Sequence, residues 1–389
     1  MFKLKKELIL FLVGVAFISI GEGIFNSVLN NYLNEAHHIT SLNRTILELP
    51  RELPGLLVVF VSTLLFFLPS RRLAAFASLF SFSGLIYMAL FPESFSLFLV
   101  WIFIFSTGQH LLIPLASSVG MELASKGQDG KRLGQVNSVR NMAVIIGSLI
   151  IYIGFRFFHF NFTISFLIAG VFYLLAALYF FKMNPGAQHP AKQRLKIYKE
   201  YKMFYWLSIL FGTRKQIFLT FAPWVLVTIY HKPTSVIATL LTFGGVAGIV
   251  FQPYLGRMID RFGEKIVLAL EAGIMIIVCL LYGFSHQLFT EHTSFLIIAT
   301  CYIIDQLLMS VSMARSIYLK KIALHPDHIS PTLTMGVTMD HFFSISIALL
   351  GGLVWYKFGF QYVFLAGSAI AIINLISALN IKYNSITTS

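Results

Sequence analysis

Charged side chains interrupt several long apolar stretches of this sequence, and they are the groups that could do chemistry. Glu22 is flanked by glycines in the first stretch, and Asp305 with Gln306 lies in a later one. Burial disfavours the charged form of a carboxyl group, so such acids take up protons more readily than in water. Both acids are therefore predicted to carry a proton or to contact a bound solute. The alternatives are an ion pair with Lys215 for Glu22, and a hydrogen bond to a neighbouring helix for Asp305.

Arg214 and Lys215 place two adjacent cations within another apolar stretch. Packing alone does not explain this pair, because ionisable groups inside a membrane are costly. The two cations are predicted either to bind an anionic group of a solute or to neutralise Glu22 and Asp305.

The remaining polar groups of the apolar stretches occur in small clusters. These are Gln109 with His110, Arg140 with Asn141, Asp340 with His341, and Glu48 with Arg51 and Glu52. Gln109, His110 and Arg140 are expected to line a solute or proton pathway, although hydrogen-bonded packing would also explain them. The others are predicted to latch or gate it. Ordinary pairing between helices is their alternative, or pairing within one helix for the Glu48 cluster. Glu271, near the start of its apolar stretch, is expected to lie at the membrane interface.

The composition indicates what kind of chain presents these groups. Hydrophobic residues make up 57% of the sequence and charged residues only 12%, where about 25% charged is ordinary for a soluble domain. The formal charge of +13 is attributed to Lys and Arg retained beside a membrane. The two cysteines are too few for a disulfide framework or a metal cluster. We expect an all-α polytopic membrane protein in a lipid bilayer, with no metal and no nucleic-acid partner.

Twelve apolar stretches are long enough to cross a bilayer as helices, for which about 20 residues suffice. They lie at 8–33, 45–68, 73–92, 94–119, 137–158, 161–181, 204–230, 234–256, 266–285, 293–317, 331–356 and 361–381. The first lacks a clear small-residue cleavage site, so it is interpreted as a retained span. A basic run at 182–202 separates six stretches from six. Domains are therefore predicted at 1–181 and 203–389, joined by this linker.

Lysine and arginine are distributed unevenly over the segments between these stretches. With the N-terminus inside, twenty of them fall in cytoplasmic segments, and only Arg44, Arg156, Lys232 and Lys357 fall outside. Positive residues are retained on the cytoplasmic side of a membrane. Both termini and the linker are therefore predicted to be cytoplasmic, in the inner (plasma) membrane of a bacterium.

The two halves of the sequence also resemble each other. Three matches occur in the same order: Glu22-Gly-Ile-Phe25 with Lys215-Gln-Ile-Phe218, Gln109-His-Leu-Leu112 with Asp305-Gln-Leu-Leu308, and Val136-Asn-Ser-Val-Arg140 with Val337-Thr-Met-Asp-His341. Together they indicate a duplicated six-helix unit, and parallel repeats are a standard transporter design.

One loop sequence carries a family resemblance. Gly256-Arg-Met-Ile-Asp-Arg-Phe-Gly-Glu-Lys265 resembles the G-x-x-x-D-R-x-G-x-[RK] signature of the major facilitator superfamily, with Gly256, Asp260, Arg261, Gly263 and Lys265 at the signature positions. Gly256 would permit close helix approach, and Asp260 could accept hydrogen bonds at a helix N-terminus. The corresponding loop of the first half, Leu68-Pro-Ser-Arg-Arg72, lacks the glycine and the Asp-Arg pair.

The resemblance implies two pseudo-symmetric bundles of six helices, with the first, fourth, seventh and tenth helices around a central cavity. It also implies a monomeric secondary transporter that moves a small organic solute by alternating access. The sequence contains neither the metalloprotease motif H-E-x-x-H nor the nucleotide-binding motif G-x-x-x-x-G-K-[ST]. We therefore expect no enzymatic activity and no cofactor, and we expect transport to be coupled to protons. Export is one expected direction. The alternatives are uptake of an organic anion or zwitterion, and a receptor built on a transporter fold.

Overall fold

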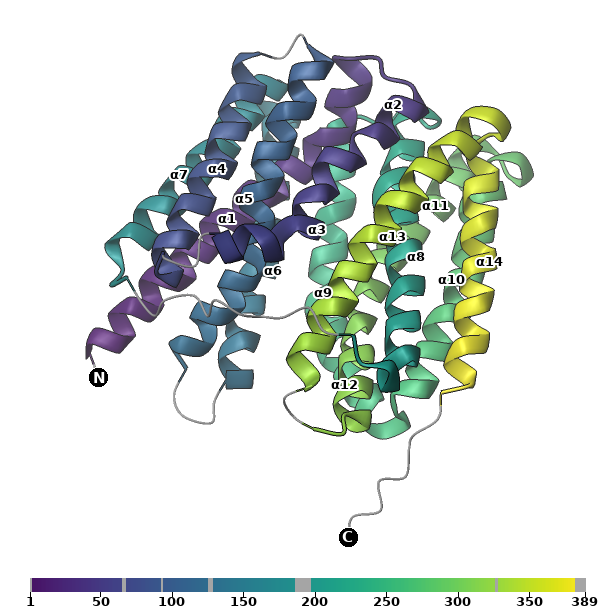
Figure 1. The fold of residues 1–389 in the computed structure, drawn as a ribbon. Helices are drawn as coiled ribbons and strands as arrows, with labels where there is room; N and C mark the ends of the chain where they lie inside the picture. The colour runs from purple at the N-terminus through teal and green to yellow at the C-terminus, as the bar shows by residue number, and fades with distance from the viewer. Residues whose placement is uncertain are drawn as a thin grey trace. The chain divides into compact units, whose positions relative to one another are not determined.

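The computed structural model describes residues 2–64, 68–91, 94–124, 129–185, 197–325 and 328–381, and their regular structure is helical (Figure 1). The first seven helices are α1 (Phe2–Glu35), α2 (Ser41–Ile46), α3 (Glu48–Leu64), α4 (Ser70–Leu90), α5 (Phe95–Glu122), α6 (Asp129–Phe157) and α7 (Phe162–Lys182). The next seven are α8 (Lys202–Thr228), α9 (Thr234–Phe262), α10 (Glu264–Leu288), α11 (Glu291–Leu308), α12 (Ser312–Ile322), α13 (Ile329–Phe358) and α14 (Phe360–Leu379). Short 3-10 turns, η1 (Lys199–Tyr201) and η2 (Met309–Val311), precede α8 and join α11 to α12.

Within these described residues, ten helical segments are long and apolar enough to cross a membrane. They are α1, α4 to α7, α9, α10, the combined segment from α11 to α12, α13 and α14. The stretches predicted at 45–68 and 204–230 correspond to α3 and α8, which are not among the ten. The helix α3 has 17 residues, and α8 includes Arg214 and Lys215. The expected all-α polytopic membrane fold is confirmed.

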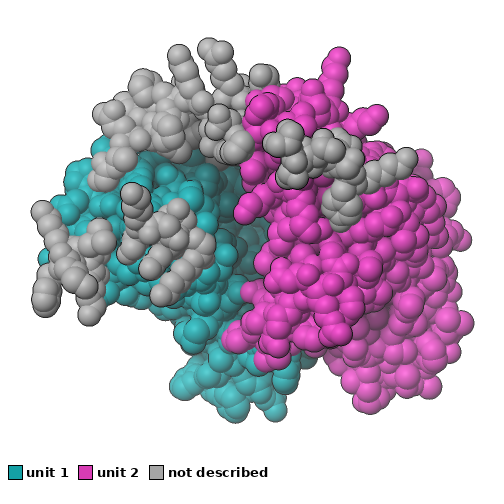
Figure 2. Space-filling model, turned by 90° about the horizontal axis from the view of Figure 1, so that it is seen from below, with its two compact units in different colours: residues 1–39, 49–192, 231–246 teal, residues 40–48, 193–230, 247–389 magenta. Residues whose placement is uncertain are grey.

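The chain forms two compact units, coloured separately in Figure 2. Unit 1 comprises Met1–Ile39, Leu49–Lys192 and His231–Val246, and unit 2 comprises Thr40–Glu48, Gln193–Tyr230 and Ala247–Ser389. The helix α2 therefore belongs to unit 2, and the first half of α9 belongs to unit 1. Residues 186–196 of the predicted linker lie outside the described part of the chain. The division into domains at 182–202 stays a prediction.

Each unit repeats the same packing pattern. In unit 1, α1 packs against α6 and α7, and α4 packs against α5 and α7. In unit 2, α8 packs against α13 and α14, and α10 packs against α11 and α14. The helices correspond in the order that the three sequence matches predict, since α1 matches α8, α5 matches α11 and α6 matches α13. The duplication predicted from the sequence is therefore visible in the packing.

Glycine sets how closely the central helices of each unit approach. A Cβ atom added to Gly23 of α1 would collide with the Val144 backbone of α6. One turn later, Ser27 Oγ donates to Ser148 Oγ at 3.3 Å, across a sequence separation of 121 residues. Residues 23 and 144 have the same separation, so α1 and α6 run side by side in the same direction. This register places Arg140 of α6 level with Ser19 of α1.

Candidate functional site

Arg214 of α8 is the centre of a buried ion network in unit 2. Its Nη1 donates to Asp305 Oδ1 of α11 at 2.5 Å, and its Nη2 donates to Glu271 Oε1 of α10 at 2.8 Å. The three side chains are no more than 3% exposed. Asn374 of α14 donates to the other oxygen of Glu271 at 3.3 Å. Buried charges are tolerated when they are paired and hydrogen-bonded in this way, because direct bonds offset their loss of hydration.

The position of Glu271 in this network differs from the one predicted from the sequence. Glu271 was expected to be interfacial, near the start of its span, but it is 2% exposed. The signal that could have found it is helical periodicity. Leu268 and Met275 are buried on α10, and Glu271 falls between them at spacings of three and four residues, which share one helix face. One alternative predicted for Arg214 was to neutralise Asp305, and the structure shows these two side chains bonded.

Lys215, the second cation of the pair, bonds a different acid. Its Nζ donates to both carboxylate oxygens of Asp340 on α13, at 2.7 and 2.9 Å. Ser344 Oγ adds a bond to Asp340 Oδ1 at 3.0 Å. Both charged side chains are largely buried, at 17% and 16% exposed. One alternative predicted for Lys215 was an ion pair with Glu22, and the structure gives it a different acid as partner. Asp340, predicted as a latch, is the partner instead.

A third cation, Arg315 of α12, packs against the same region of unit 2. Its Cζ lies 3.5 Å from the centroid of the Phe211 ring. The same ring lies 5.2 Å from Arg214 Cζ and 6.0 Å from Lys215 Nζ. Arg315 also interacts electrostatically with Glu271. Arg214, Lys215 and Arg315 therefore balance the charges of the three carboxylates Asp305, Glu271 and Asp340. The Phe211 ring lies within cation–π distance of all three cations.

Glu48 belongs to a smaller buried cluster of unit 2. Arg44 Nη1 donates to Glu48 Oε1 at 2.5 Å, and both side chains are completely buried. Gln216 Nε2 of α8 donates to the other oxygen of Glu48 at 3.0 Å and to Thr220 Oγ1 at 2.8 Å. Pairing within one helix was predicted among residues 48, 51 and 52. Arg44, four residues earlier and in α2, is a partner of Glu48 that the sequence pattern did not indicate. The pairing among residues 48, 51 and 52 stays a prediction.

Unit 1 gathers three of the predicted site residues around one hydroxyl group. Tyr173 of α7 is fully buried, and its hydroxyl accepts a hydrogen bond from Gln109 Nε2 of α5 at 3.2 Å. Glu22 of α1 and Arg140 of α6 both interact electrostatically with this hydroxyl. Both are half-buried. In the described part of unit 1 neither charged side chain makes a hydrogen bond or an ion pair, so two opposite charges act on the same hydroxyl without bonding each other.

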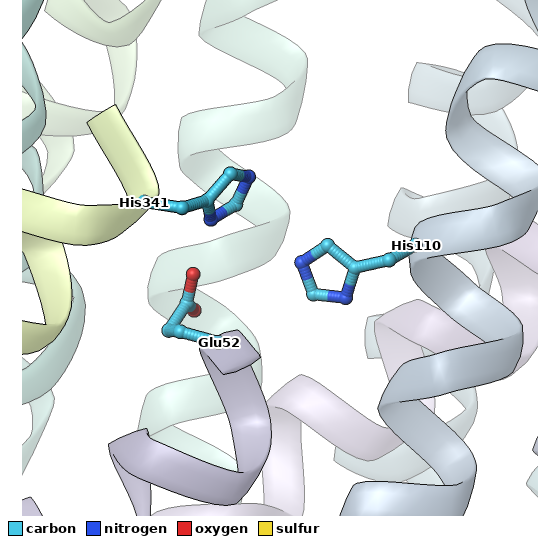
Figure 3. Close-up of side chains that lie close together, drawn as sticks. All are labelled: Glu52, His110 and His341. Carbon is cyan, nitrogen blue, oxygen red and sulfur yellow. The ribbon is translucent and has the colours of Figure 1, made fainter. Parts of the chain in front are cut away.

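Helices α3 and α5 bring Glu52 and His110 of unit 1 together (Figure 3). A carboxylate oxygen of Glu52 and a ring nitrogen of His110 lie within 4.8 Å of each other. His110 Nδ1 also lies 3.0 Å from Ser106 Oγ, which donates to the backbone carbonyl of Arg51. Two side chains supply fewer ligands than the three or four that zinc sites use, so this pair of unit 1 is not by itself a metal centre.

Three other predicted residues lie beside these groups. Asn141 follows Arg140 on α6, and His341, also drawn in Figure 3, follows Asp340 on α13 of unit 2. Gln306 is hydrogen-bonded to Tyr302 within α11. The roles predicted for these residues stay predictions.

The loop signature is placed at the junction of α9 and α10. Gly263 has a φ of +81°, a conformation that glycine adopts without strain. A Cβ atom on Gly256 would meet nothing within 4 Å among the described residues, so the close helix approach expected there is not observed. Asp260, Arg261 and Lys265 are not buried. The buried acid of this segment is Glu264, whose Oε1 lies 2.7 Å from Lys321 Nζ of α12.

A family profile described as Major Facilitator Superfamily matches residues 11–319 and 204–383. Among solved structures, a D323A mutant of the nucleoside transporter NupG is similar, with a TM-score of 0.76 and 14% identity over 96% of this chain and 99% of that one. A POT family transporter in complex with a thioalcohol conjugated peptide has a TM-score of 0.76 and 11% identity, over 95% and 94% of the two chains. A D-xylose-proton symporter has a TM-score of 0.72 and 13% identity, over 97% and 98%. At these identities the likeness shows the fold alone. The sequence matches none of the curated proteins with which it was compared.

Proposed function

Since the chain belongs to the major facilitator superfamily, we propose that it is a proton-coupled secondary transporter of a small organic solute. It works as a monomer by alternating access, with both termini and the linker on the cytoplasmic side of a bacterial inner (plasma) membrane. The observation that carries proton coupling is the charge-balanced network around Arg214. Protonation of one carboxylate there would leave a buried positive charge in excess, and such a charge is costly enough to change the pairing.

Asp305 is the carboxyl group that we assign to the proton. Glu271 accepts bonds at both of its oxygens, from Arg214 and from Asn374. Asp305 accepts one from Arg214 at Oδ1, and its Oδ2 accepts none from the described residues. A proton on Oδ2 would remove the negative charge that holds Arg214 Nη1, and Arg214 would then be held by Glu271 alone. Arg214 would thus have two arrangements, one bonded to both Asp305 and Glu271 and one bonded to Glu271 alone. A switch between transport states requires two such arrangements.

Export in exchange for protons and uptake together with protons both use this cycle. Uptake of an organic anion or zwitterion is the second candidate, and Arg140 favours it. This cation of unit 1 makes no ion pair with the described residues, so its charge is available to an anionic group.

The proposal is tested in proteoliposomes with an imposed pH gradient and a panel of small organic solutes. The wild-type protein should accumulate its solute in response to the gradient. Asp305→Asn should abolish that accumulation and keep exchange of solute without a gradient, because the proton carrier alone is lost. Glu291→Gln is the matched control, since Glu291 is an exposed acid at the start of the same helix.

Gradient-driven accumulation by Asp305→Asn at the wild-type level would remove Asp305 from this role. A wild-type protein that transports its solute identically with and without a pH gradient would overturn proton coupling itself.

A further inference from the structure

We propose that the transported solute is a zwitterion, and that Glu22 and Arg140 of unit 1 bind its ammonium and anionic groups. This inference rests on the proposed transport function and names the class of solute that is transported.

Arg214 and Lys215 of unit 2 are already bonded to carboxylates. Arg214 bonds Asp305 and Glu271, and Lys215 bonds both oxygens of Asp340. A solute anion at either cation would compete with these carboxylates, and a displaced carboxylate would be left buried without its bond. These cations are therefore poor anchors for a substrate, although the sequence alone made them candidates for one.

Two charges of unit 1 are in the opposite condition. Glu22 and Arg140 both interact electrostatically with the Tyr173 hydroxyl, and with the described residues they form neither an ion pair nor a hydrogen bond. Both side chains are half-buried in a membrane-spanning bundle, where water cannot fully hydrate them. The carboxylate of Glu22 therefore has unused hydrogen-bond acceptors, and the guanidinium of Arg140 has unused donors. A ligand that carries both complementary charges would satisfy the two of them at once.

Two further polar groups surround this pair. Ser19 lies one turn before Glu22 and level with Arg140, and its Oγ is buried with no hydrogen-bond partner in the described part of the chain. Gln109 is oriented by the bond from its Nε2 to Tyr173, so its amide oxygen remains as an acceptor. Around Tyr173, α1, α6 and α5 thus contribute a carboxylate, a guanidinium and an amide oxygen, and Ser19 adds a hydroxyl one turn from Glu22.

The arrangement discriminates by charge. A singly charged solute would satisfy one of Glu22 and Arg140 and would desolvate the other without a partner, which costs affinity. A hydrogen bond to a charged group contributes about 1.5–3 kcal/mol, which corresponds to about tenfold or more in affinity. A zwitterion should therefore bind at least about tenfold more tightly than analogues that lack either charge.

The test measures binding to the purified full-length protein in detergent, with no proton gradient. The zwitterionic probes are glycine, 4-aminobutanoate and 6-aminohexanoate, which separate the two charges by increasing lengths. Hexanoate and hexylammonium are the matched analogues with one charge each. At least one amino acid should bind about tenfold or more tightly than both analogues. Glu22→Gln should remove the preference over hexanoate, and Arg140→Gln should remove the preference over hexylammonium, while Glu291→Gln leaves both preferences unchanged.

Several outcomes would overturn the inference. They are failure of all three amino acids to bind at millimolar concentration, equal binding of a singly charged analogue, and preferences that survive in folded Glu22→Gln and Arg140→Gln. Thermal unfolding of the ligand-free variants shows that they are folded. Since binding needs no gradient, loss of proton coupling would not affect this result. Conversely, gradient-driven transport of a singly charged solute would overturn the zwitterion and leave the proposed function intact.

Discussion

Unit 1 and unit 2 share one packing pattern, but Glu22 and Arg140 of unit 1 differ in their bonding from three carboxylates of unit 2. In the described part of unit 2, Asp305, Glu271 and Asp340 all bond a cation of the same unit. In unit 1, Glu22 and Arg140 bond neither each other nor another described residue. Our two proposals assign different chemistry to the two sets of charges. The paired carboxylates of unit 2 would respond to a proton, because protonation changes their charge balance, whereas Glu22 and Arg140 would respond to a ligand that supplies the opposite charges.

Removal of Arg214 should give the largest effect on stability. Arg214→Gln leaves two carboxylates buried without their cation, and breaking a buried pair in this way costs about 3–5 kcal/mol of the free energy of unfolding. Arg140→Gln removes a cation that makes no bond, so it should change that free energy by no more than about 0.5 kcal/mol. Denaturant-induced unfolding in mixed micelles measures both. Equal losses in the two variants would mean that the units do not differ.

A double-mutant cycle for Lys215 and Asp340 should give the next largest effect. The bonds of Lys215 Nζ to both carboxylate oxygens predict a coupling energy between about 0.5 and 3 kcal/mol, obtained from Lys215→Gln, Asp340→Asn and the double variant. The matching cycle for Glu22 and Arg140, without ligand, should give a coupling below about 0.5 kcal/mol. Strong coupling in the second cycle would show that the charges of unit 1 pair with each other and are closed to a solute.

The elements of this fold are largely predictable from the sequence, because each depends on local composition. Apolar stretches of sufficient length predict the membrane helices, and the matches between the halves predict which helices correspond. Helix α8 shows the limit of this approach. Its polar residues lower its mean hydropathy, so it is not among the ten segments that length and hydropathy identify. The apolar stretch at 204–230 nevertheless predicts it.

The partners of the charged residues could not be predicted in the same way. The pairing of Lys215 with Glu22 was inferred from their equivalent places in the repeat. Equivalence maps residues onto each other in two bundles and does not bring them into contact. The observed partner, Asp340, depends on how α13 packs against α8, and Gly212 leaves the room for it, since a Cβ there would collide with Asp340 itself. Glu271 was misplaced because its position along the span was considered without the rotational phase of α10.

Two tyrosines provide a smaller test of the difference between the units. The hydroxyl of Tyr173 accepts a bond from Gln109 in unit 1, and that of Tyr282 donates to the Ala222 carbonyl in unit 2 at 2.7 Å. Each substitution to Phe should lower the free energy of unfolding by about 1 kcal/mol, the usual contribution of one hydrogen bond. Only Tyr173→Phe should also weaken binding of the amino-acid probes, because it releases Gln109. Weaker binding in Tyr282→Phe would extend the solute site to unit 2.

The smallest effect concerns His37, which follows α1 in unit 1. Its Nε2 lies 2.9 Å from the Tyr32 hydroxyl, and its ring packs against Phe95 and Phe98. Burial, with a smaller contribution from the adjacent His38, lowers the pKa of His37. The fold therefore favours the neutral ring, whereas the unfolded chain protonates it near its ordinary pKa of about 6.5. The resulting stabilisation is complete above that pH and is lost as the pH falls through it.

Thermal unfolding at pH 7.5 and pH 5.5 measures this contribution. Part of the loss of stability at pH 5.5 should disappear in His37→Gln, while titration of every other group is common to the variant and the wild type. His159→Asn is the control, because His159 is an exposed histidine in another loop of unit 1, and asparagine tolerates its positive φ of 52°. An unchanged pH difference in His37→Gln would exclude His37 as a source of acid sensitivity. The loss of stability at pH 5.5 would then come from other titrating groups. The same measurement on Arg214→Gln tests the carboxylates of unit 2, because that variant removes their cation.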